Sequence, residues 1–157
     1  MSLESRIAAL EAKSDICDLK ARYARICDDG YDGDAIAELF IEGGSWASNT
    51  YPEVSGRLAI ARFMREIGRD VFPWAVHLLS NPRVDVALED GTAVGRWDLL
   101  QIATQDQDSV LALGRYEDRL ELVDGDWRFT AVRVDFSYVG TLAEGWGRGS
   151  SGFLGSV

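Results

Sequence analysis

The chain has 157 residues and an apolar fraction of 46%, which is enough for one hydrophobic core and too much for a disordered chain. Its 26 acidic and 16 basic residues give a formal charge of −10, which opposes contact with nucleic acids and anionic membranes. Its 2 cysteines make neither a disulfide framework nor a zinc site, and no apolar run reaches membrane-spanning length. We therefore expect one cytoplasmic domain that binds neither nucleic acid nor a membrane.

Three helices are expected in the N-terminal part of the chain. Residues 14–27 form the first, because apolar side chains recur there at three- and four-residue steps. These side chains are Ile16, Leu19, Tyr23 and Ile26. Gly30 is placed to end this helix, and Asp32 or Asp34 can cap a short second one. A third amphipathic helix is expected over residues 58–71.

After residue 73 the chain changes to long strands joined by short turns, two of which contain an Asp-Gly pair. The strand segments are 74–90, 92–104, 109–125 and 126–140. Helices followed by consecutive strands, without βαβ alternation, predict an α+β fold. Strands of this length must bend, so we expect a curved antiparallel sheet that forms a cone around the three helices.

The outer face of this sheet is expected to contact another subunit. The segment SVLALGRYEDRLEL carries apolar residues on both of its faces, which is unusual for a strand with one face in water. We therefore expect a homo-oligomer, either a dimer or a trimer. The domain is expected to cover residues 1–142, followed by a Gly/Ser-rich tail over 143–157. This tail is expected to be a frayed end or, alternatively, a lid over a pocket or an arm onto a neighbouring subunit.

Two residues stand out as candidates for chemistry. His77 lies in the strand WAVHLLSN, where alternation places it on one face with Ala75 and Leu79. Imidazole can take a proton from carbon and deliver it to a leaving group, although a lone histidine among aliphatic side chains is also commonly a packed core residue. Asp28 lies near the C-terminus of the first helix, where a carboxylate is disfavoured. Either a hydrogen bond within the loop or to the start of the next helix, or a pairing with histidine, could compensate.

The stretch ARYARICDDGYDGDAIAELF, followed about fifty residues later by His77 and then by GRYEDRLELVDGDWRFTAVRV, resembles the SnoaL-like branch of the nuclear transport factor 2-like superfamily. The resemblance covers residues 21–138 and implies the same cystatin-like cone of helices and bent sheet. Within the superfamily, Tyr23, Asp28 and His77 have a spacing similar to that of the scytalone dehydratase and bile acid 7α-dehydratase group.

The two halves of this group imply different sets of residues. Scytalone dehydratases use two histidines in the pocket, whereas His77 is the only histidine of this chain. The bile acid 7α-dehydratase pattern combines one histidine with a Tyr, two Asp and an Arg, so Asp98 and Arg133 on later strands would complete it. Alternation places Arg133 on the face of Trp127 and Phe129. As alternatives, Asp98 could form an ordinary ion pair with an arginine, since Arg96 lies on the same strand face, and Arg133 could pair with Asp135 or an adjacent strand.

The resemblance implies a cofactor-independent, scytalone-dehydratase-like lyase that removes water from a hydrophobic cyclic β-hydroxy carbonyl compound. His77 would act as general base and acid, Asp28 would fix its tautomer, and Tyr23 would donate a hydrogen bond to the substrate carbonyl. Neither a cofactor nor a metal is implied. The alternatives are a ketosteroid-isomerase-type double-bond isomerase and a non-catalytic ligand-binding or assembly module, such as a dioxygenase small subunit.

Overall fold

The computed structural model describes residues 2–146, which form α-helices, one π-helical turn and six strands. The tail expected over 143–157 lies mostly outside the described residues. The helical elements are α1 (Leu3–Asp28), α2 (Gly33–Ala37), α3 (Arg57–Glu66) and the π-helical turn η1 (Ile67–Val71). Within this part of the chain, no helix is both long and apolar enough to cross a membrane. The first helix is longer than expected, and the third ends in a π-helical turn.

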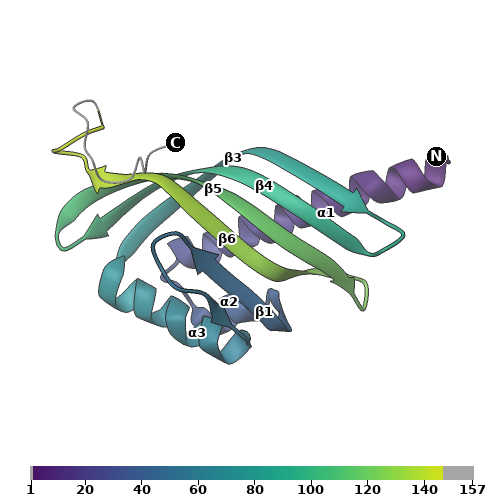
Figure 1. Ribbon diagram of the computed structural model, residues 1–157, viewed down its shortest axis with the longest axis horizontal. Helices are drawn as coiled ribbons and strands as arrows, with labels where there is room; N and C mark the ends of the chain where they lie inside the picture. Colours follow the sequence, from purple (N-terminus) through teal and green to yellow (C-terminus); the bar gives the residue numbers. More distant parts are fainter. Residues whose placement is uncertain (1, 147–157) are drawn as a thin grey trace.

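The strands form one curved sheet in the order β2-β1-β6-β5-β4-β3. They are β1 (Phe40–Ser48), β2 (Val54–Ser55), β3 (Trp74–Ala87), β4 (Thr92–Gln105), β5 (Asp108–Val123) and β6 (Asp126–Thr141). The four long strands are antiparallel, as expected, but β1 pairs with β6 in parallel, so the sheet is mixed. Figure 1 shows the long strands arched over α1, with α2 and α3 below.

Alternate side chains of the long strands point toward the helices and form the core with α1. Along β4, the buried side chains on this inner face are Ala93, Trp97, Leu99, Gln101 and Ala103. The helix contributes a buried stripe made of Ala12, Ile16, Tyr23 and Cys27. Tyr23 therefore points into the core, as the helical periodicity predicts.

A bulge in β6 changes which face its side chains reach. The register against β5 shifts between Arg119 and Leu120, which leaves one extra residue in β6 near Thr130. Val132 is consequently buried with Phe129, whereas Arg133 is exposed. The expectation that Arg133 shares a face with Phe129 was wrong, because strict alternation does not hold across a bulge.

A buried ion pair joins α1 to β5. Lys20 Nζ lies 2.8 Å from Asp118 Oδ2, and both side chains are fully buried. The ammonium also lies 3.3 Å from the ring centre of Tyr116 and 4.5 Å from that of Tyr23, in cation–π contact. Burial raises the pKa of the Asp118 carboxyl to about 6, although the Lys20 charge opposes this shift.

The start of α2 requires glycine because it packs directly on α3. A Cβ atom at Gly33 would overlap the backbone carbonyl of Ala61. We expect Gly33→Ala to lower the free energy of unfolding by about 1–3 kcal/mol, the usual cost of overpacking. Gly43→Ala, where no atom lies within 4 Å of the added carbon, is the control. Urea denaturation measures both, and a wild-type midpoint for Gly33→Ala would contradict this prediction.

Candidate active site

His77 and Asp28 meet where α1 ends against the inner face of β3. Asp28 Oδ1 lies 2.7 Å from His77 Nδ1 and accepts a second hydrogen bond of 2.9 Å from the His77 backbone N–H. The His77 side chain is 5% exposed and that of Asp28 is 14% exposed. This bond assigns a proton to Nδ1, so Nε2 of the neutral ring is left as an acceptor. One carboxylate therefore fixes both the position and the tautomer of the imidazole.

Asp28 owes its position to the way the helix ends. It is the last residue of α1, and the chain then turns sharply through Gly30 and Tyr31, which have φ angles of 106° and 57°. The C-terminal end of a helix disfavours a carboxylate, and the two N–H donors of His77 offset this. The sequence left open whether a local hydrogen bond or a pairing with histidine compensates for this unfavourable position of Asp28. The structure contains the pairing with histidine.

Tyr31 places its hydroxyl within hydrogen-bond distance of the second ring nitrogen of His77. Its Oη lies 3.5 Å from His77 Nε2, and the two rings meet edge to face. Tyr31 is buried, and this burial raises the pKa of its phenol well above the usual value, so the hydroxyl keeps its proton and can donate it in a hydrogen bond. Its left-handed backbone is uncommon for a non-glycine residue and often marks functional sites. The sequence signal that could have found it is an aromatic residue within an Asp/Gly turn.

Tyr23 lines the same cavity as His77, but its hydroxyl has another partner. The indole Nε1–H of Trp46 donates to Tyr23 Oη over 2.9 Å. Burial raises the pKa of the Tyr23 phenol well above its usual value. The cavity has a volume of about 30 Å³, and most of its wall is aromatic. The structure therefore brings Tyr23, Asp28 and His77 to one site, with Tyr31 as the tyrosine beside the imidazole.

Gln101 is a further polar residue of this cavity that the sequence reasoning missed. It lies on β4 directly opposite His77 in the ladder and is only 3% exposed. Its amide Nε2 has no hydrogen-bond partner among the described residues. The available signal was a single polar side chain on the inner face between Leu99 and Ala103.

Asp98 and Arg133 lie on the outer face of the sheet, away from this cavity. Asp98 accepts hydrogen bonds of 3.0 Å from Arg115 and 2.8 Å from Asn81. Arg133 donates to both carboxylate oxygens of Asp135, at 3.0 and 2.7 Å. The structure therefore does not bring Asp98 or Arg133 to His77. Arg133 has the pair with Asp135 that the sequence offered as an alternative, and Asp98 also forms an ordinary ion pair, but with Arg115 of β5 and not with Arg96 of its own strand.

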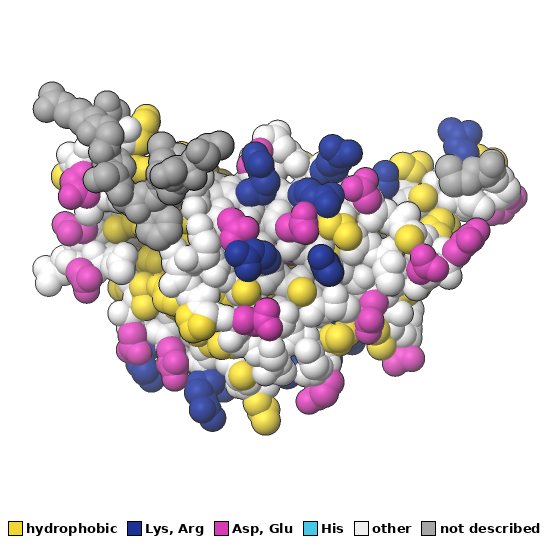
Figure 2. Space-filling view, in the orientation of Figure 1, with side chains coloured by type: hydrophobic (Ala, Val, Ile, Leu, Met, Phe, Trp, Pro, Cys, Tyr) yellow, Lys and Arg dark blue, Asp and Glu magenta, His cyan; other side chains and the backbone are white. Residues whose placement is uncertain are grey.

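These two residues belong to a pattern of alternating charge. Figure 2 shows basic and acidic side chains intermixed across the middle of the sheet. The strand register places opposite charges side by side in two rows: Arg96, Glu117 and Arg133 in one, and Asp98, Arg115 and Asp135 in the next. Exposed ion pairs of this kind each contribute little to stability. Asp98 is therefore a suitable control position for tests of the cavity.

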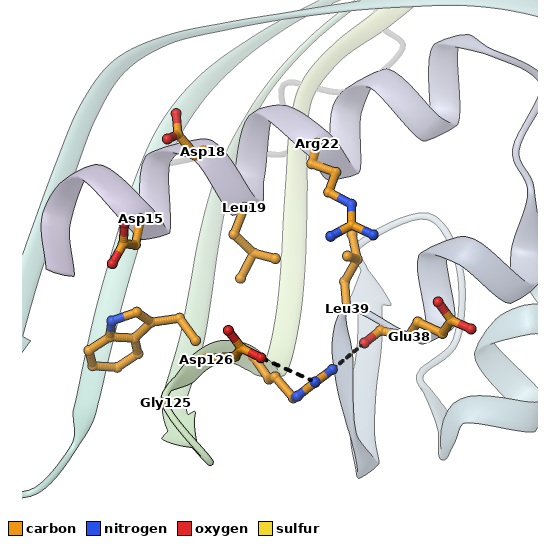
Figure 3. Close-up of a pocket in the computed structure, with 10 residues that line it drawn as sticks. Asp15, Asp18, Leu19, Arg22, Glu38, Leu39, Gly125 and Asp126 are labelled. Atoms are coloured by element: carbon orange, nitrogen blue, oxygen red, sulfur yellow. Dashed lines mark hydrogen bonds and ion pairs between the residues drawn. The ribbon is translucent and has the colours of Figure 1, made fainter. Parts of the chain in front are cut away.

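A second hollow lies at the surface between α1 and the start of β6 (Figure 3). Arg22 and Asp126 of its wall are open to solvent. Arg128 donates to the backbone carbonyl of Glu38 over 2.7 Å and lies 3.9 Å from Asp126. This hollow shares no lining residue with the His77 cavity among the described residues. We take the His77 cavity as the candidate site because it combines a paired acid–base residue with an apolar enclosure.

The arrangement of helices packed inside one curved sheet defines the fold class of the protein. The fold is the cystatin-like cone of nuclear transport factor 2-like proteins. Residues 8–133 match the SnoaL-like domain, and the chain belongs to that family. The chain matches no curated protein.

Solved structures with this fold include two from Novosphingobium aromaticivorans. A candidate scytalone dehydratase is 23% identical with a TM-score of 0.76, over 85% of this chain and 89% of the other. A nuclear transport factor 2-like protein is 24% identical with a TM-score of 0.73, over 90% and 91%. The hexachlorocyclohexane dehydrochlorinase LinA-type3 of Novosphingobium barchaimii is 19% identical with a TM-score of 0.79, over 88% and 94%. At these identities the comparisons show the fold alone.

Proposed function

We propose that this protein is a cofactor-independent lyase that removes water from a hydrophobic cyclic β-hydroxy carbonyl compound. The observation that carries the proposal is the His77–Asp28 pair, whose acceptor Nε2 meets the Tyr31 hydroxyl at 3.5 Å and is otherwise enclosed mainly by apolar and aromatic side chains. Two proteins with the same fold are named for eliminations, one as a candidate dehydratase and one as a dehydrochlorinase. Such eliminations need a base close to a carbon-bound proton, which is what Nε2 supplies.

In the proposed reaction, Nε2 of His77 takes the proton from the carbon next to the carbonyl, and the electron pair of that C–H bond forms an enolate. Asp28 stabilises the imidazolium that results. Tyr31, the hydroxyl closest to Nε2, donates to the enolate oxygen, the role that the resemblance implied for Tyr23. The imidazolium then protonates the leaving hydroxyl on the same face. Water and an α,β-unsaturated carbonyl compound are released.

The test is an elimination assay on a panel of cyclic β-hydroxy ketones, run in D2O so that exchange of the α-proton is also recorded. We expect the wild type to form the enone, and His77→Gln to be slower by at least about 100-fold because it has no titratable nitrogen. Asp98→Asn, on the outer face, should retain wild-type rates. A wild type that neither exchanges the α-proton nor forms enone across the panel would contradict the proposal.

A double-bond isomerase is the second candidate, because removal of the α-proton from a β,γ-unsaturated ketone gives a dienolate, which can take the proton back at its γ-carbon. The observation that favours it is again the position of Nε2, which can return a proton as well as remove one. A β,γ-unsaturated cyclic ketone added to the same panel separates the two activities. Conversion of this ketone without dehydration of the hydroxy ketones would favour the isomerase.

A further inference from the structure

An apolar chamber lies next to the His77 cavity. It has a volume of about 150 Å³. Four residues line both spaces, so the two spaces lie side by side: Tyr51, Phe72, Gln101 and Phe136. Much of the remaining wall consists of small and aliphatic side chains, including Ala103, Val110, Ala112 and Val139. Within the described part of the chain, no Lys, Arg, Asp or Glu side chain lines either space.

The size and polarity of the chamber restrict its ligand. An apolar cavity of roughly 150 Å³ can hold a benzene-sized molecule, so the chamber has room for a single six-membered ring. A carboxylate or phosphate group would lose its hydration there without gaining a cationic partner, which is strongly unfavourable. The walls therefore favour an uncharged ring.

Gln101 supplies a hydrogen-bond donor at the junction of the two spaces. It lines both of them, and its place in the β3–β4 ladder sets it beside His77. Its buried Nε2 has no partner among residues 2–146, although buried amide groups in folded proteins nearly always have one. An uncharged oxygen atom of a ligand would satisfy this donor.

We propose that the chamber binds the uncharged ring of the substrate and that Gln101 donates a hydrogen bond to its carbonyl oxygen. The adjacent carbon then faces His77, and Gln101 and Tyr31 both donate to the oxygen on which enolate charge develops. The inference rests on the proposed function in one respect, the identification of the carbon next to the carbonyl as the reacting carbon. The binding mode itself does not require that any reaction occurs. An amide cannot give up a proton, so His77 remains the group that both removes and returns one.

Three ligands of similar size test the binding mode: toluene, acetophenone and benzoate. All three contain one six-membered aromatic ring. Toluene has no oxygen atom, acetophenone has a neutral carbonyl group, and benzoate has a charged carboxylate. We expect NMR titration of the wild type to give a dissociation constant for acetophenone that is at least about tenfold lower than that for benzoate. Gln101→Leu should weaken acetophenone binding about fivefold and leave toluene binding unchanged, because only acetophenone uses the amide.

Two further variants separate the roles of the donor and the space. Gln105→Leu changes the same residue type at the chamber wall but outside the inner cavity, and should keep the preference for acetophenone. Ala112→Leu places a larger side chain in the chamber and should abolish binding of both neutral ligands. Equal affinity for benzoate and acetophenone, or unchanged acetophenone binding by Gln101→Leu, would overturn the inference. Selective acetophenone binding without elimination of any hydroxy ketone would support the proposed binding mode and refute only the proposed lyase activity.

Discussion

Replacing Asp28 with asparagine is expected to lower kcat by about 10²–10⁴-fold while the protein stays folded. Asparagine has nearly the same shape as aspartate, so it can still accept the hydrogen bond from the backbone N–H of His77. It carries no negative charge, so it cannot stabilise the imidazolium that forms during proton transfer. In the flipped orientation the amide N–H would instead donate to Nδ1, which would move the ring proton to Nε2 and block the base, at the loss of the backbone hydrogen bond.

This prediction is measured as kcat and KM on the best hydroxy ketone of the panel, with thermal unfolding as a check on folding. Asp98→Asn is the matched control, because it makes the same chemical change in an ion pair on the outer face. The double variant Asp28→Asn/His77→Gln should be no slower than His77→Gln alone, since the two residues act as one unit. If Asp28→Asn retained the wild-type kcat, the carboxylate would have only a structural role.

The local pattern of the sequence was sufficient to place His77 and Asp28. Alternation along the strand puts His77 on the inner face with Ala75 and Leu79, and helical periodicity puts Tyr23 on the buried side of α1. The oddity of a carboxylate at a helix C-terminus predicts that Asp28 needs a partner. Each of these predictions depends on the residue pattern within one helix or one strand, which can be read from the sequence alone.

Contacts between elements were not predictable in the same way. Gln101 becomes part of the site because the β3–β4 register sets it opposite His77, and Tyr31 because the loop after α1 turns it toward Nε2. The parallel pairing of β1 with β6 joins segments that are far apart in the chain. Arg133 shows the opposite error, because one extra residue in β6 is enough to turn its side chain to the outer face.

The buried Lys20–Asp118 pair leads to the second large effect. Asp118→Leu is expected to lower the free energy of unfolding by about 3–5 kcal/mol, because it leaves the Lys20 ammonium buried without its counter-charge. Lys20→Met/Asp118→Leu removes both charges and fills the same space with apolar atoms. It should recover most of the lost stability, since apolar replacements of a buried pair are often neutral or stabilising. Urea denaturation of the three proteins measures this, and a double variant no more stable than Asp118→Leu would contradict it.

The pair should also make stability depend on pH in a specific direction. Folding raises the pKa of Asp118 from 3.8 to about 6, so between these values the folded protein binds more protons than the unfolded chain. The stabilisation from this carboxyl is therefore complete below pH 3.8 and is lost as the pH rises through about 6. Relative to Lys20→Met/Asp118→Leu, the wild type should lose stability as the pH rises from 3.8 to about 6, because over this range the unfolded chain releases the Asp118 proton before the folded protein does. Parallel profiles would mean that Asp118 stays ionised throughout. The Lys20 ammonium also packs on Tyr116 and Tyr23, which line the His77 cavity, so the kcat of the double variant would report whether the charged pair is needed to hold this wall of the site.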